Sequence, residues 1–124
     1  MIHLDTSFLI RALVSGAPQE KRLLGWLDAG DAVAVCSPVW AEFLCGPVSD
    51  DVAELARTLL GPPVSLGRAE AERAAALFNA GGRRRGSLID CLIAATAIEA
   101  GARLATTNAR DFERFRSAGL DLAS

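Results

Sequence analysis

Residues 87–112 read SLIDCLIAATAIEAGARLATTNARDF, and this stretch decides the predicted fold. Residues 88–100 are almost all apolar and stand between Ser87 and Gly101, which is typical of a buried helix with a defined start and end. Residues 103–107 follow directly and predict a strand. A helix that leads straight into a strand is the repeating unit of a parallel α/β sheet.

The same alternation runs through the rest of the chain. We expect further strands at residues 1–5, 32–36 and 120–122, and a brief edge strand at 64–66. We expect further helices at residues 7–15, 20–28, 38–45, 52–60, 70–78 and 110–117, with Ser37 as the N-cap of the third. Residues 1–124 are therefore predicted to form one α/β domain, a doubly wound parallel sheet flanked by helices on both faces.

The composition is that of a globular protein. Of 124 residues, 51% are hydrophobic and 23% are charged, which excludes an intrinsically disordered chain. No apolar run approaches the ~18 residues that cross a bilayer, and the first residues lack a basic, cleavable leader pattern. Three cysteines without CxxC spacing and a single histidine argue against a zinc site. We expect a cytoplasmic protein with no membrane association.

Acidic residues stand at the junctions between strands and helices. They are Asp5, Glu42, Asp90 and Asp111. An open parallel sheet binds ligands at the carboxyl ends of its strands, so we expect these four acids to meet there. Crowded carboxylates repel one another unless a divalent cation lies between them. The pattern favours a hydrolase in which Mg²⁺ or Mn²⁺ activates water for attack on a phosphodiester.

Two of these acids also have structural interpretations. Asp5 precedes a helix, but Thr6 and Ser7 are available as caps, so the sequence does not require Asp5 for capping. Ser87 and Asp90 fit the spacing of a capping box, which places the acid beside a helix N-terminus and is compatible with metal binding.

The other two acids are expected in first helical turns. Glu42 lies about one turn into its helix, and Asp111 would be the third residue of a short helix capped by Asn108. A carboxylate at either position is favoured by the helix dipole alone.

The segments HLDTSFLI, SPVWAEF and SLIDCLIAATAIEAGARLATTNARDF resemble the PIN-domain ribonucleases, and more closely the VapC-like toxins of bacterial toxin–antitoxin pairs. The resemblance covers essentially the whole chain. It implies a doubly wound sheet, Mg²⁺ or Mn²⁺ at the acidic cluster, and cleavage of RNA. It also implies inhibition by a small cognate antitoxin, and it suggests a homodimer.

The resemblance assigns the acids to positions in the family pattern. Asp5, Glu42 and Asp90 occupy the places of the first three acids. Asp111 matches one common form of the fourth, whereas other members carry an acid where this chain has Asn108. Either residue is therefore expected to complete the metal shell.

Substrate contacts are expected around the same positions. The resemblance implies that Thr6 or Thr107 contributes a hydroxyl to metal or phosphate. Arg83, Arg84 and Arg85 form a compact basic loop just before Asp90, although the net charge is −2. Arginine presents a planar fork suited to phosphate, so this loop is expected to hold RNA; a solvated loop, or one that contacts acidic residues of an antitoxin, is the alternative.

Other readings of the first acid fit less well. Phosphatases with a nucleophilic aspartate need a second acid two residues later, where this chain has Ser7. A phospho-receiver domain needs a lysine on a late strand, whereas Lys21 is the only lysine. A catalytically inactive RNA- or protein-binding module of the same fold remains as the alternative to a nuclease.

Overall fold

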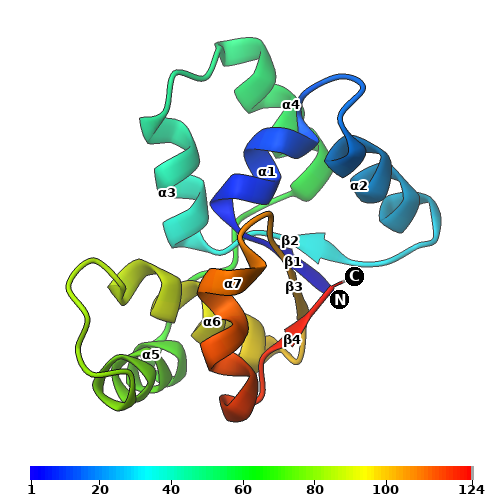
Figure 1. Ribbon diagram of the computed structural model, residues 1–124. Coiled ribbons are helices and arrows are strands. Elements are labelled where there is room, and N and C mark those ends of the chain that lie inside the picture. The colour runs from blue at the N-terminus through cyan, green and yellow to red at the C-terminus, as the bar shows by residue number, and fades with distance from the viewer. Residues whose placement is uncertain (124) are drawn as a thin grey trace.

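The computed structural model describes residues 1–123, which contain one sheet of four parallel strands (Figure 1). The strands are β1 (Ile2–Leu4), β2 (Val33–Ala34), β3 (Arg103–Ala105) and β4 (Asp121–Leu122). Their order is β2-β1-β3-β4. Ile2 lies opposite Val33 on one side and Arg103 on the other, so β1 is an inner strand. The predicted parallel sheet is confirmed.

Helices cover both faces of this sheet. They are α1 (Thr6–Ala12), α2 (Pro18–Asp28), α3 (Ser37–Cys45), α4 (Asp50–Leu60), α5 (Arg68–Ala80), α6 (Leu88–Ala100), α7 (Ala109–Phe112) and the 3₁₀ helix η1 (Glu113–Ala118). Helices α1 to α4 lie on one side of the strands, and α5 and α6 lie on the other (Figure 1). The doubly wound α/β architecture is therefore confirmed. No helix within residues 1–123 is long and apolar enough to cross a membrane.

The core forms where the inner strands meet the helices. Ile2, Leu4 and Leu104 are at most 1% exposed, as expected of parallel strands that are covered on both faces. Phe8 of α1 is fully buried, and its ring centroid lies 5.6 Å from that of Trp26 in α2. This packing fixes α1, and with it the residues at its N-terminus, against the end of β1.

Helix α6 has the bounds that the sequence predicts. Its middle is buried along Cys91, Ile93 and the residues 94–97, and the small alanine side chains let the helix lie close to its neighbours. Gly101 ends it in the left-handed conformation at φ 64°, a conformation that glycine adopts without the steric cost that a Cβ brings. The chain then turns directly into β3.

Several predicted boundaries are wrong. The helix expected at 7–15 ends at Ala12, and the strand expected at 64–66 is a single bridge between Val64 and Cys36. Cys36, not Ser37, is the N-cap residue of α3. The Ser37 hydroxyl instead donates to the Val64 carbonyl at 3.0 Å. Tertiary hydrogen bonding to the Val64 segment thus replaces the local capping that the sequence suggested.

Candidate functional site

A cleft of about 290 Å³ lies at the carboxyl ends of the inner strands, and we call it the acidic cleft. All four predicted acids line it, together with Asn108 and Thr6. Its lining residues are Asp5, Thr6, Ser7, Ile10, Glu42, Asp90, Ile93, Asn108, Asp111 and Phe112. Residues far apart in the sequence are thus brought to one place, as the strand-end argument predicts.

The topology explains why these acids meet. Asp5 follows β1 directly, and Asn108 and Asp111 follow β3. Because β1 and β3 are parallel neighbours, their carboxyl ends lie at the same edge of the sheet. Helix α6 leads into the start of β3, so its own N-terminus, which carries Asp90, lies back at that edge. Glu42 reaches the cleft from α3, which packs against α1 and α6.

Asp5 is the most constrained of the four acids. It is 3% exposed, and its carboxylate accepts hydrogen bonds from the Phe8 amide and the Ser7 hydroxyl, both at 2.8 Å, and from the Thr106 hydroxyl. Burial raises the pKa of this carboxyl above its usual value, and the three hydrogen bonds oppose the rise. Thr6 and Ser7 were expected to be available as caps, so that Asp5 would not be needed for capping; in the structure Asp5 itself is the N-cap of α1.

Thr106 is a residue that the sequence analysis missed. Its hydroxyl donates to Asp5 and accepts from the Asn108 amide at 2.9 Å. Of Thr107, which was expected to offer its hydroxyl, only the backbone amide makes a hydrogen bond in the described residues, to the Ser7 hydroxyl at 3.3 Å. Strand β3 ends at Ala105 and not at residue 107, and the sequence gives no signal that separates the two threonines.

Glu42 is held from the other side of the acidic cleft. Its side chain is exposed on α3, and Oε1 accepts a hydrogen bond of 2.6 Å from the Thr6 hydroxyl. Thr6 was expected to contact metal or phosphate directly; in this structure it orients a carboxylate. The two helices α1 and α3 are thereby joined by a polar contact at the cleft.

Asp90 stands in a field of negative charge. Burial raises the pKa of its carboxyl, the nearby Asp111 raises it further, and Glu42 and Asp5 add smaller effects in the same direction. Arg114 opposes them by stabilising the charged form. The other three acids thus lie close enough to Asp90 for their negative charge to disfavour its ionised form.

Two predicted helix caps at the acidic cleft are right in position but form no capping hydrogen bond in the described residues. Ser87 is the N-cap residue of α6, yet it forms no capping box, and its hydroxyl donates to the Arg84 carbonyl at 2.7 Å. Asn108 occupies the N-cap position of α7, but its side chain makes no capping hydrogen bond. The Asn108 side chain thus remains available at the cleft.

A second cleft, of about 460 Å³, adjoins the first, and we call it the arginine cleft. Its lining residues are Arg84, Arg85, Gly86, Ser87, Asp90, Arg110, Asp111 and Arg114. Arg84 and Arg85 belong to the predicted basic loop. Arg83 does not line this cleft, and its Nε donates to Asn79 Oδ1 at 3.0 Å. Arg110 and Arg114 were missed, although their i, i+4 spacing next to Asp111 is visible in the sequence.

The acidic cleft suits a hard divalent cation by the kind of ligands it offers. Its polar lining consists of carboxylate, amide and hydroxyl oxygens, which Mg²⁺ and Mn²⁺ prefer. Within residues 1–123, no three His, Cys, Asp or Glu side chains are close enough to form a ligand group as they lie. The residues therefore offer the kind of oxygen ligands that such a cation prefers, and they line the same cleft, but their carboxylates do not yet converge on one point.

Comparison with known proteins identifies the fold family. The PIN domain family model matches residues 2–117. This chain belongs to the PIN domain family. A curated relative of this PIN domain, ribonuclease VapC11 of Mycobacterium tuberculosis, is 38% identical over 122 residues, which cover 91% of this chain and 90% of the relative.

Solved structures show the same fold. The VapBC2 structure from Rickettsia felis, bound to a DNA fragment from its promoter, aligns with a TM-score of 0.77 at 22% identity, covering 99% of this chain and 98% of that one. A toxin–antitoxin complex from Klebsiella pneumoniae aligns with a TM-score of 0.71 at 27% identity, covering 91% of each chain. The PIN-domain resemblance of the sequence is thus confirmed by both comparisons.

The hydrogen bonds to Asp5 lead to a prediction for the metal-free PIN domain. Asp5→Asn removes a buried charge and keeps a good N-cap that still accepts from the Phe8 amide, so the free energy of unfolding should stay equal or rise. Asp5→Ala leaves the Phe8 amide and two hydroxyls without their acceptor and should lower it by about 1–2 kcal/mol. Urea unfolding at neutral pH measures both.

The comparison between these two variants is the control. If Asp5→Asn destabilises the metal-free protein as much as Asp5→Ala does, then the charge of Asp5 stabilises the fold. That result would contradict the view that Asp5 is an acid crowded by other acids, because removing its charge would then not lower the free energy of unfolding.

Proposed function

We propose that this protein is a divalent-metal-dependent endoribonuclease that acts as the toxin of a toxin–antitoxin pair. The observation that carries the proposal is the meeting of Asp5, Glu42, Asp90 and Asp111 in one cleft. The relative from M. tuberculosis, which covers nine-tenths of this chain, is named a ribonuclease. The chain offers no other arrangement in the cleft that suits nucleophilic catalysis, because its lining contains neither cysteine, histidine nor lysine.

The cation in this proposal is Mg²⁺ or Mn²⁺. Asp5, Glu42, Asp90 and Asp111 would hold it, and Asn108, which lines the same cleft, would add an amide oxygen. When bound, such a cation lowers the pKa of an attacking water and stabilises negative charge at the phosphate. Because the carboxylates do not form a compact ligand group as they lie, binding requires their side chains to move toward a common point.

The chain's own residues set how far each acid can move. Asp5 is fixed by its three hydrogen bonds to α1 and to the segment after β3. Glu42 is exposed and is held by a single contact with Thr6, so it can rotate toward the cleft centre. We infer that Asp5 is the rigid reference point of the site and that Glu42 adjusts to the cation.

The predicted substrate contacts divide into two groups in the structure. Thr6 lines the acidic cleft, and Arg84 and Arg85 line the arginine cleft beside it. These three residues are retained in the proposal as contacts to the cation shell or to RNA phosphates. Arg83 and the Thr107 side chain line neither cleft.

An apolar cleft of about 390 Å³ supports the proposal of an antitoxin partner. It is lined by Ile10, Leu13, Val14, Phe43, Gly46, Pro47, Val48, Ser49 and Val52. Ile10 and Val14 are 50% and 54% exposed, and Ile10 also lines the acidic cleft. A peptide segment bound to the apolar cleft would therefore reach the acids and block them.

The homodimer remains a prediction. Analytical sedimentation of the purified protein would measure its oligomeric state.

Metal-dependent cleavage is the first prediction of the proposed function. Purified chain incubated with structured RNAs and Mg²⁺ or Mn²⁺ should give discrete cuts that vanish with EDTA. Asp5→Asn and Asp90→Asn should each lower the rate by ~100-fold or more, because even outer-shell changes at metal sites cost about 10–100-fold. Gel analysis of end-labelled RNA measures the rates.

The matched control is Asp28→Asn, since Asp28 is an exposed acid at the end of α2, outside the cleft. It should cut like the wild type. RNA binding without cleavage under any metal condition would instead favour the alternative, an inactive RNA- or protein-binding module.

The antitoxin proposal predicts a variant that separates binding from cleavage. Val14→Asp places a charge in the apolar cleft, and burying an unpaired charge is costly, so affinity for the cognate antitoxin should fall by at least ~10-fold. RNA cleavage by the free protein should remain, because Val14 does not line the acidic cleft. Calorimetric titration with the antitoxin measures the affinity; an unchanged affinity would place the partner elsewhere.

A further inference from the structure

We propose that the arginine cleft holds the RNA backbone on one side of the bond that is cut, with Arg84, Arg110 and Arg114 as positioning residues for the flanking phosphates. The inference rests on the proposed ribonuclease function and extends it. Two of its residues, Arg110 and Arg114, lie outside the basic loop that the sequence predicts to hold RNA.

The two clefts share part of their lining. Asp90 and Asp111 line both of them, so they form the boundary between the acids and the arginines. An RNA strand whose scissile phosphate lies in the acidic cleft passes over this boundary into the arginine cleft. The phosphates that follow along that strand then meet guanidinium groups on one side only.

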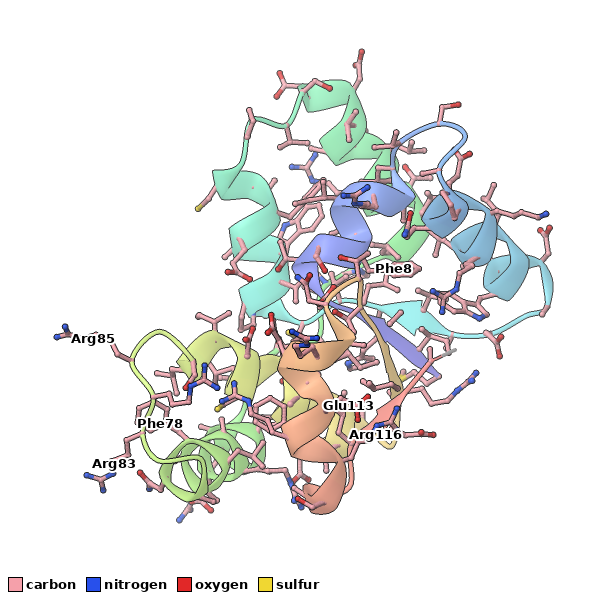
Figure 2. The ribbon with its side chains drawn as sticks, in the orientation of Figure 1. Phe8, Phe78, Arg83, Arg85, Glu113 and Arg116 are labelled. Atoms are coloured by element: carbon pink, nitrogen blue, oxygen red, sulfur yellow. The ribbon has the colours of Figure 1, made fainter. Side chains whose placement is uncertain are left out.

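The arginines of this cleft differ from other arginines of the described chain in forming no ion pair. Within residues 1–123, Arg57, Arg68, Arg73 and Arg116 form ion pairs with glutamates. The four arginines of the cleft form none, although two carboxylates lie beside them. Even without Arg85, whose side chain projects from its loop away from the protein (Figure 2), three arginines stand against the two acids Asp90 and Asp111, so neutralising these two acids does not account for the cluster.

Arg114 is held in place for such a contact. Its Nε donates to the Asp111 carbonyl at 3.3 Å, and its guanidinium lies 4.4 Å from the centre of the Phe115 ring. Its terminal N–H groups make no hydrogen bond within the described chain. A guanidinium that is already oriented loses less conformational entropy when it binds a phosphate.

Arg84 is anchored beside the first turn of α6. Its carbonyl accepts from the Ser87 hydroxyl at 2.7 Å and from the Ser87 amide at 3.1 Å. Arg83 and Arg85 project from the same loop away from the body of the protein (Figure 2). The three consecutive arginines thus differ in their contacts. The backbone of Arg84 is fixed by Ser87, and both Arg84 and Arg85 line the cleft. Arg83 instead donates a hydrogen bond to Asn79.

A nucleic-acid backbone suits this cleft better than an acidic protein segment. RNA carries a phosphate at every nucleotide, so a strand fixed by one phosphate presents the next at a regular spacing. Arginine forks bind phosphate oxygens in pairs. Such contacts position the strand without reading its sequence.

The experiment measures the salt dependence of RNA binding. Asp5→Asn protein in EDTA, which cannot cut, is titrated against a labelled single-stranded RNA over a series of KCl concentrations. Arg84→Gln, Arg110→Gln and Arg114→Gln, each in this background, should make the slope of log affinity against log salt shallower by about 0.7, the value for one lost phosphate contact. Thermal melting checks that each variant is folded.

Two variants serve as matched controls. Arg103→Gln removes the same charge at the exposed start of β3, at the opposite edge of the sheet. Arg83→Gln removes it from the same loop but outside the cleft. Both should keep the slope of the parent protein. Equal slope changes in the cleft variants and the controls would overturn the proposal, because they would indicate that RNA is attracted by the overall charge of the protein and not by this cleft.

A second measurement does not depend on the folding of a variant. Wild-type protein cuts RNAs in which single linkages near the cleavage site are replaced by neutral methylphosphonates. KM should rise for neutral linkages on one side of the cut and not on the other. An equal rise on both sides, or none, would contradict a one-sided grip.

The remaining outcomes separate this inference from the proposed function. If Arg114→Gln lowers kcat but leaves the salt slope of RNA binding unchanged, the arginines only balance the charges of Asp90 and Asp111. If polyglutamate displaces an RNA of the same length from the protein, the cleft is a surface for an acidic protein. Both results overturn the inference. Cleft-dependent slopes in a protein that never cuts RNA would support the cleft as an RNA site and contradict the nuclease.

Discussion

The carboxylate of Asp5 joins three parts of the protein that the rest of the site depends on. Asp5 directly follows β1, and its carboxylate caps α1 by accepting from the Phe8 amide. The same carboxylate accepts from the Thr106 hydroxyl in the segment after β3. A buried charge at this point is costly unless it is hydrogen-bonded, and its donors come from two separate segments: Ser7 and Phe8 lie in α1, and Thr106 lies after β3. The same contacts that stabilise the strand ends therefore fix the first acid of the site in one position.

Around this fixed point the charges are arranged in two adjoining groups. Asp5, Glu42, Asp90 and Asp111 line one cleft, and four arginines line the next. Asp90 and Asp111 belong to both, and Arg114 stabilises the charged form of Asp90 while the other acids oppose it. Such an arrangement suits a cation on one side and anionic phosphates on the other.

The sequence predicted the meeting of the acids because that depends only on the order of strands and helices. Asp5 and Asp111 follow strands, and Asp90 opens a helix that leads into a strand, so parallel topology alone brings them to one edge. The bounds of α6 were also predictable, since its apolar run ends at Gly101.

Individual hydroxyl bonds were not predictable, because they depend on tertiary contacts. Ser37 and Ser87 look like helix caps in sequence, yet they donate to the carbonyls of Val64 and Arg84. Thr106 and Thr107 are chemically alike, and only the end of β3 at Ala105 decides which one reaches Asp5. The arginine cleft was missed for a related reason, since it forms only when α7 and η1 lie against the loop before α6.

Metal binding by the acids tests the central claim most directly. Thermal melting of the purified protein is followed while Mn²⁺ is added, in the wild type and in Asp5→Asn, Asp90→Asn and Asp28→Asn. A ligand that binds only the folded state raises Tm as its concentration rises. We expect this rise in the wild type and in Asp28→Asn, and little or none in the two site variants. An unchanged Tm in the wild type, or an equal rise in all four proteins, would contradict a cation site formed by these acids.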